Sequence, residues 1–197
     1  MFSTDDRIRQ IKSSAERLFL EDGYVRTTMQ AIANAANISK KTLYEIYPDK
    51  AAVFLAVLRE QDTDLMFTPL EDGQSAREAL ISSMTQVVSF LFRPRQLALT
   101  RIAISEGDPE LSRALETHID GSYRTFLARM IEMADQGLLG RDAADRYADL
   151  MLGAALGSWH LRALAGGREE PRNSLIDDRI CDVVDTFAAR LQLDSGS

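Results

Sequence analysis

The sequence predicts an all-α protein built from an N-terminal three-helix head and a larger helical body. Apolar residues recur at three- and four-residue spacing along nearly all of the 197 residues, and no alternating β pattern extends beyond a few residues. Hydrophobic residues make up 45% of the chain and charged residues 27%, so the chain has enough apolar material for a buried core. We place the head at residues 1–50 and the body at residues 51–197.

The first helix of the head is expected to begin after a cap at Ser3 or Thr4. It is expected to end at Gly23, because glycine readily adopts the left-handed conformation that stops a helix. Its apolar face is formed by Ile8, Ile11, Ala15, Leu18 and Phe19.

A second, short helix is expected from Thr27 or Thr28 to about Ala36. Thr27 with Gln30 fits a capping box, in which each side chain bonds the backbone of the other residue. Asn37 follows, and asparagine tolerates the left-handed conformation that a tight turn requires.

The third helix is expected over Lys40–Ile46, with Ser39 as its cap and an end before Pro48. Asp49 then caps a fourth helix that reaches about Leu65 and joins the head to the body. Residues 68–74 are expected to form a loop. Further helices are expected over residues 75–92, 95–105, 109–118, 119–136, 142–165 and 173–193, and the division of the 109–136 stretch stays open because no clear breaker interrupts it.

Charge is distributed unevenly along a chain whose net charge is −7. Residues 1–50 hold eight basic and seven acidic side chains, whereas the rest of the chain holds fifteen basic and twenty-three acidic ones. All four lysines, Lys12, Lys40, Lys41 and Lys50, lie in the head. The net charge argues against polyanion binding over the whole surface. The asymmetry weakly favours a local anion site in the head over a merely arginine-preferring composition.

Two short helices joined by a tight turn are the layout of a helix-turn-helix. The first turn of the second helix of such a unit enters the major groove, where lysine can donate to guanine O6 and N7. Hydroxyl groups and helix N-termini on either side can hold phosphates. The alternative is that the tyrosines belong to the core and the lysines to a solvated face. The residues expected to contact DNA are Thr28, Ser39, Lys40, Lys41, Thr42, Tyr44, Tyr47 and Lys50.

A dense run of motif residues extends along the head: Leu18-Phe19, Gly23-Tyr24, Thr27 to Ala33, Ala36 to Tyr44 and Tyr47 to Lys50. On these residues the head resembles the N-terminal domain of TetR/AcrR transcriptional regulators over about the first fifty-five residues. Asn37 stands where the family usually has glycine, Lys41 where a small residue is common, and Tyr47 where the family has phenylalanine. Segments of the body that include Glu106–Leu111 and Ala163–Gly166 are similar to the AefR-like subgroup.

The resemblance implies a homodimeric repressor that binds double-stranded operator DNA through the helix-turn-helix and is released by a small apolar or amphiphilic effector. In such regulators the last two helices usually form a four-helix bundle between two subunits. The last helix carries apolar residues at three- and four-residue steps, and the helix before it carries small residues. The alternative is that these two helices only close their own core. The residues expected at the dimer interface are Gly153, Gly157, Ile180, Val184, Phe187 and Leu191.

An effector pocket is the other implication of the resemblance. Apolar side chains of the 75–92 helix are expected to face an aromatic stripe of the 119–136 helix, although such a stripe is more often plain core. His118 and His160 are further candidates for its few polar groups, and adjacent Trp159 and His160 point about 100° apart, so at most one is central. The residues expected to bind the effector are Met84, Val88, Arg101, Tyr123, Phe126, Met130 and Trp159.

Other classes of protein are less consistent with the sequence. A small helical enzyme would need catalytic groups for which we find no paired carboxylates, nucleophile–base signature or phosphate loop. With two histidines and the single Cys181, a His/Cys metal site and an internal disulfide are not expected, and no cofactor is predicted. A signal peptide and a membrane span are not expected either, so the predicted location is cytoplasmic. A helical adaptor that uses the head only for protein contacts remains the third alternative.

Overall fold

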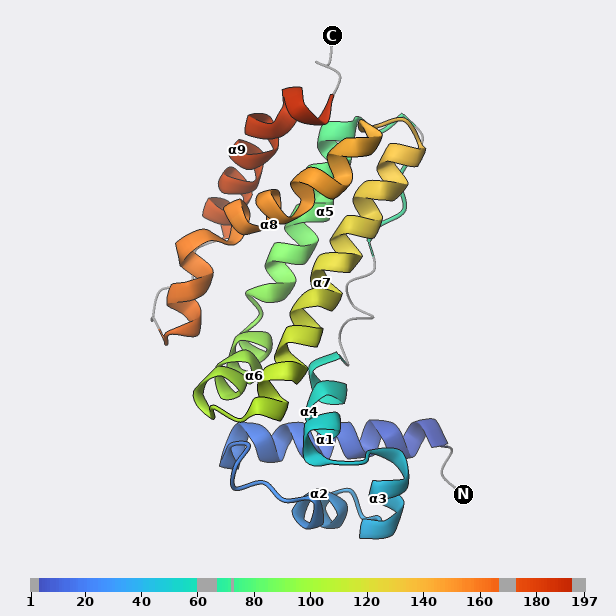
Figure 1. Cartoon of the computed structure of the whole chain (residues 1–197), viewed down its shortest axis with the longest axis vertical. Coiled ribbons are helices and arrows are strands. Elements are labelled where there is room, and N and C mark those ends of the chain that lie inside the picture. The colour runs from blue at the N-terminus through green and yellow to red at the C-terminus, as the bar shows by residue number, and fades with distance from the viewer. Residues whose placement is uncertain (1–3, 60–66, 72, 167–172, 193–197) are drawn as a thin grey trace. The chain divides into compact units, whose positions relative to one another are not determined.

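The computed structural model describes residues 4–59, 67–71, 73–166 and 173–192. Every regular element within those ranges is a helix, which confirms the all-α prediction. In chain order the helices are α1 (Thr4–Asp22), α2 (Met29–Ala35), α3 (Lys40–Ile46), α4 (Lys50–Leu58), α5 (Ala76–Leu91), α6 (Pro94–Ser105), α7 (Pro109–Asp135), α8 (Arg141–Leu164) and α9 (Asn173–Leu191) (Figure 1).

The first of two compact units combines the described residues up to 59 with residues 94–119. In it α1 packs against α2, α4 and α6. The rings of Phe19 and Phe54 meet edge to face at 5.1 Å, and Leu99 of α6 and Leu111 of α7 join the same core. The boundary expected after residue 50 would cut through this core. The structure instead groups α4, α6 and the beginning of α7 with the head.

Side-chain caps fix where the short helices of this unit begin. Thr28, and not Thr27, caps α2 by accepting a hydrogen bond from the amide of Ala31 at 3.1 Å. Thr27 is buried, and its hydroxyl donates to the carbonyl oxygens of Leu18 and Gly23. The capping box expected for Thr27 and Gln30 is therefore replaced by a simple cap shifted by one residue.

The second unit contains the described residues of 65–93 and those from 120 onward. In it α9 packs against both α5 and α8. The core draws fully buried side chains from each long helix of the unit, and burying each removes apolar surface from water. These side chains include Leu80, Met84, Val88, Phe126, Met130, Met151, Ile180, Val184 and Leu191.

Two long helices differ from the expected pattern. The 109–136 stretch forms the single helix α7 and not two helices. Conversely, α8 is interrupted at Gly157, whose φ of 49° and ψ of −150° lie outside the helical region. The expected extension of α4 to Leu65, the Ser3 cap and the end of the last helix at residue 193 lie outside the described residues.

Candidate functional site

The first turn of α3 projects a polar, exposed set of side chains. Ser39 caps the helix by accepting from the amide of Thr42 at 3.0 Å, and the two hydroxyl groups are 2.8 Å apart. Lys40 and Lys41 are exposed, and the Lys41 ammonium lies 4.0 Å from the carboxylate of Glu45. An ion pair that long and that exposed is weak, so it leaves Lys41 available to an anion.

The turn between α2 and α3 holds that helix in place. Asn37 adopts a φ of 53°, as its chemistry predicted, and the amide of Ile38 then donates to the carbonyl of Ala33 at 3.0 Å. Thr28 is exposed at the start of α2, and its capping hydroxyl keeps its own hydrogen for an outside acceptor.

The two tyrosines predicted to contact DNA differ in exposure. Tyr44 is 45% exposed, with the Lys40 ammonium 5.8 Å from its ring centroid. Tyr47 is partly buried and packs against the core of the first unit. The ring of Tyr47 thus contributes to packing in the first unit, whereas the ring of Tyr44 lies on the exposed surface of α3.

Lys50 is partly buried and is held by backbone acceptors. Its ammonium donates to the carbonyl oxygens of Tyr24 at 2.6 Å and Thr27 at 2.9 Å, and lies 4.0 Å from the Tyr24 ring centroid. Burial lowers the pKa of Lys50, and the nearby carboxylates of Asp108 and Glu106 offset part of that effect. Two of the three N–H donors of the ammonium therefore bond the protein's own backbone, and one is left for a phosphate. The main role of Lys50 in this structure is thus to stabilise the 24–27 segment.

Glu106 supports the same segment. Its carboxylate accepts from the amides of Tyr24 at 3.1 Å and Val25 at 3.4 Å. The residue follows α6 directly, so it joins the end of that helix to the connection between α1 and α2. Nothing in the sequence pattern identified Glu106 as a partner of the head, because 82 residues separate it from Tyr24.

A second link joins the beginning of α6 to the head. The guanidinium of Arg95 makes a bidentate pair with Glu16 of α1, at 2.5 and 2.9 Å, and donates to the carbonyl of Val57 at 3.0 Å. Next to it, the amide nitrogen of Gln96 lies 2.6 Å from Nε2 of His118. Desolvation by burial, with Arg59 and Arg95 nearby, lowers the pKa of His118 to about 4.

The structure brings most of the predicted effector residues into the second unit. Met84, Val88, Phe126 and Met130 are fully buried there, and Tyr123 is partly buried.

Two predicted effector residues lie elsewhere. Arg101 is on α6 in the first unit, so the division of the chain separates it from the others. Trp159 lines a groove between α8 and α9 together with Arg179. Its neighbour His160 instead packs edge to face on Phe92, with the ring centroids 5.4 Å apart.

Arg129 is a polar residue of this region that sequence reasoning missed. Its side chain is 5% exposed and donates to Ser83 at 3.2 Å, Glu132 at 2.8 Å and the carbonyl of Thr68 at 2.6 Å. An arginine one residue before Met130, within an otherwise apolar helix face, was the available signal.

The predicted dimer residues divide into two groups. Ile180, Val184 and Leu191 are fully buried within the protomer, where α9 packs on α5 and α8. They are therefore core residues, and the structure corrects their assignment to a surface between subunits. Gly153 is exposed, and Gly157 and Phe187 are partly exposed.

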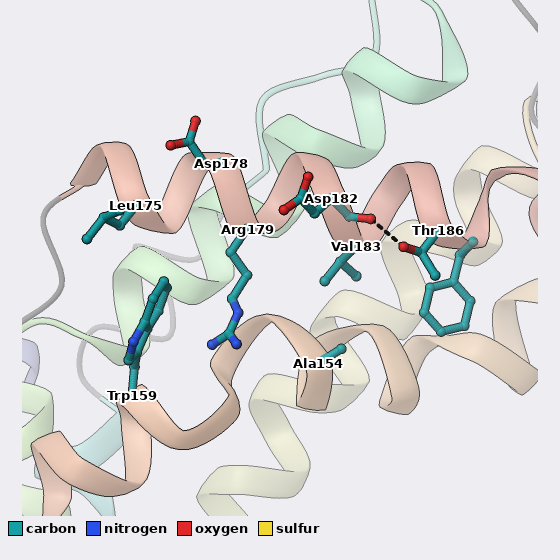
Figure 2. Close-up of a pocket in the computed structure, with 9 residues that line it drawn as sticks. Ala154, Trp159, Leu175, Asp178, Arg179, Asp182, Val183 and Thr186 are labelled. Atoms are coloured by element: carbon teal, nitrogen blue, oxygen red, sulfur yellow. Dashed lines mark hydrogen bonds between the residues drawn. The ribbon is translucent and has the colours of Figure 1, made fainter.

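A groove runs along the outer side of α8 and α9, with a volume of about 480 Å³ (Figure 2). Its apolar lining includes Trp159, Leu175 and Phe187, and its charged lining consists of Asp178, Arg179 and Asp182. Val183 belongs both to the groove lining and to the buried side of α9, so the groove borders the buried stripe of that helix. Among the residues that the structure describes, no helix is long and apolar enough to cross a bilayer.

Comparisons with known proteins agree with this architecture. Residues 11–57 match the bacterial regulatory proteins of the tetR family, and residues 78–192 match the C-terminal domain of AefR-like transcriptional repressors. The HTH-type transcriptional repressor Rv1474c of Mycobacterium tuberculosis is 34% identical over 110 residues, which cover 54% of this chain and only 55% of that protein.

Two further proteins match over most of their length. The HTH-type transcriptional repressor AcnR of Corynebacterium efficiens is 26% identical over 175 residues, covering 86% of this chain and 88% of that protein. The structure of the flavonoid-responsive regulator FrrA superposes with a TM-score of 0.75 at 24% identity, covering 98% of this chain and all of that one. The matching families and the curated relatives are transcriptional regulators and not enzymes. The chain belongs to the TetR family of transcriptional regulators, with a C-terminal domain of the AefR-like type.

Proposed function

We propose that the protein is a homodimeric repressor that binds operator DNA through α3 and is released by a small apolar or amphiphilic effector. The observation that carries this proposal is the first turn of α3, where Lys40 and Lys41 are exposed and Thr42 is partly exposed beside the Ser39 cap. An exposed first turn that carries two cations suits the major groove. Because such a regulator acts on the chromosome, its place is the cytoplasm.

DNA binding is tested by gel shift with the DNA upstream of the protein's own gene. A dimer presents each cation twice, so the logarithm of affinity should fall with the logarithm of salt concentration with a slope of several units. Shuffled DNA of the same length is the control, and it should bind more weakly at every salt concentration. An affinity that is independent of salt would instead favour the helical adaptor.

Dimerisation is supported by the exposed small and apolar residues along α8 and α9. Leu150 is 54% exposed, and Gly153 and Ala154 are exposed at helical spacing from it. Two heads related by a two-fold axis would then meet two half-sites about 34–36 Å apart on a pseudo-palindromic operator. Sedimentation velocity across a concentration series measures the oligomeric state directly.

The effector region is proposed at the buried face formed by Met84, Val88, Phe126 and Met130, with Arg129 in place of Arg101 as its polar group. Apolar walls with few polar groups are typical of small-molecule sites. The fold is shared with FrrA, a regulator described as flavonoid-responsive, which makes flat aromatic compounds the first class to screen. Linkage requires that operator DNA weaken effector binding by the same factor, about 5–150-fold, by which effector weakens DNA binding. Calorimetric titration with and without operator tests this, and an effector affinity unchanged by operator would exclude the allosteric role.

A further inference from the structure

The groove between α8 and α9 contains an arginine whose position is set by an aromatic ring. The Arg179 guanidinium lies 4.2 Å from the ring centroid of Trp159, close enough for a cation–π contact. Figure 2 shows Arg179 extending from α9 towards the bend in α8, with Trp159 beside it. The guanidinium is thus held at a fixed place in the groove and does not extend freely into solvent.

Gly157 makes the room that Arg179 occupies. A Cβ atom at Gly157 would lie 2.7 Å from Nη1 and 3.2 Å from Cζ of Arg179, so any side chain there would force the guanidinium to move. The same glycine adopts the φ of 49° that interrupts α8. Glycine accepts this backbone conformation without a steric penalty, and the break in α8 coincides with the place that the guanidinium occupies.

Arg179 has no acidic partner within the described part of the chain. Its Nη1 atom is buried and makes no hydrogen bond there. Asp178 and Asp182 lie on the same helix and line the same groove, yet neither pairs with it. In Figure 2 Asp178 points away from α8. A charged N–H donor normally has an acceptor, and the groove offers one cation, Arg179, and two carboxylates, Asp178 and Asp182, that have no ion-pair partner among the described residues.

We propose that Arg179 pairs with the partner's Asp182, and Asp182 with the partner's Arg179, when a second copy of the chain fills the groove. This rests on the homodimer proposed above and specifies which residues meet in it. In an isologous interface each contact occurs twice, with the roles of the two subunits exchanged. A two-fold axis that passes α9 between Ile180 and Cys181 brings both pairs together. The same register places Leu175 opposite the partner's Thr186, and both residues line the groove.

A second copy fits the groove because the charges are self-complementary. Arg179 and Asp182 lie one helical turn apart, so an antiparallel α9 presents them in reverse order. Charge pairs of this kind contribute mainly to the choice of partner and of register, while the apolar lining contributes the burial. An apolar groove alone could bind many helical surfaces. The two charge pairs therefore make the groove specific for a second copy of this chain.

The test exchanges the charges in two separate variants. Arg179→Asp places two carboxylates opposite each other, and Asp182→Arg places two guanidinium groups opposite each other. Each variant alone should show a dimer dissociation constant raised at least about tenfold in sedimentation equilibrium. An equimolar mixture restores both opposite-charge pairs, so native mass spectrometry should show predominantly the heterodimer. The double variant Arg179→Asp/Asp182→Arg should again form homodimers.

Asp177→Arg is the matched control, because it makes the same change of charge on the same helix at an exposed residue that does not line the groove. It should leave the dissociation constant within about twofold of the wild type. Trp159 is the only tryptophan of the chain, so its emission reports on the groove as the dimer dissociates. Circular dichroism establishes that each variant is folded.

The outcomes distinguish failure of the homodimer from failure of the specific pairing between Arg179 and Asp182. A monomeric wild-type protein would overturn both the homodimer and this pairing. A wild-type dimer whose single variants dimerise normally would overturn the pairing and leave the homodimer standing through another surface. Single variants that dissociate but do not form the heterodimer when mixed would also overturn the pairing. Preferential heterodimer formation supports it.

Discussion

The carboxylate of Glu106 accepts the backbone amide of Tyr24 at 3.1 Å, which ties the end of α6 to the connection that precedes the helix-turn-helix. Lys50 holds the same segment by donating to the carbonyl oxygen of Tyr24 at 2.6 Å. One residue thus has its amide bound to an anion and its carbonyl to a cation. Neither contact involves DNA, yet both set the position from which α2 begins.

We expect Glu106→Ala to weaken operator binding without altering sequence preference. The partly buried amide of Tyr24 and the exposed amide of Val25 lose a charged acceptor, which costs about 2 kcal/mol of unfolding free energy. The measurements are urea denaturation and gel shift on operator and non-operator DNA. Glu116→Ala, which removes the same charge from an exposed position on α7, should change neither quantity. Loss of affinity for the operator alone would argue that Glu106 acts on base recognition.

Lys50→Ala should act mainly through stability. The ammonium makes two hydrogen bonds to carbonyl oxygens and one cation–π contact, so its removal should cost about 2–3 kcal/mol. The salt dependence of DNA binding by the folded variant should then remain close to that of the wild type. A slope reduced by about one unit per lysine removed, with unchanged stability, would instead identify Lys50 as a phosphate contact.

Lys41→Ala and Thr42→Ala should change which operator sequences bind. Both residues lie in the first turn of α3, where side chains reach base edges, and each good bidentate base contact contributes about 1–3 kcal/mol of discrimination. Binding to a library of single-base operator variants measures the change. Arg17→Ala removes an exposed cation of α1, and we expect it to leave the order of preferred sequences intact. Equal losses on every sequence would contradict the assignment of α3 as the recognition helix.

Stability should fall in mildly acidic solution because of His118. Burial lowers its pKa from 6.5 to about 4, so the unfolded chain binds a proton at a higher pH than the folded one. The contribution is therefore complete above about pH 6.5 and is lost as the pH falls through the range to about 4, by roughly 3 kcal/mol in total. Denaturation of the wild type and His118→Gln at pH 7.5 and pH 4.5 measures the effect, and the variant should lose less. Equal losses in both proteins would mean that other groups cause the acid sensitivity.

Gly157→Ala should destabilise the protein by about 2 kcal/mol and displace Arg179. The added methyl would meet Nη1 at 2.7 Å, and alanine is strained at a φ of 49°. Gly121→Ala is the matched control within a helix, α7, because it meets nothing within 4 Å. Helix propensity predicts that this control is neutral or stabilising by up to about 1 kcal/mol. Thermal denaturation compares the two variants. A Gly157→Ala protein as stable as the wild type would contradict the close contact between Gly157 and the Arg179 guanidinium.

The sequence alone determined the helical class, the helix-turn-helix and its turn. These features depend on local chemistry: apolar spacing selects a helix, Ser39 and Asp49 cap the helices that follow them, and Asn37 adopts the left-handed turn. Periodicity also identified the residues of the buried stripe on α9. It did not show whether Ile180 and Val184 face another helix of the same chain or of a second chain, because both surroundings require the same apolar spacing.

Only the tertiary structure decided which distant residues serve the head. Glu106 and Arg95 are ordinary charged residues in the sequence, and their role depends on α6 packing against α1. The same is true of Lys50, whose position at a helix start suggested an anion site until its ammonium was found on two carbonyl oxygens. A charged side chain bonds whichever opposite charge or dipole the fold brings within about 3 Å, and sequence spacing does not encode that distance beyond a helical turn or two.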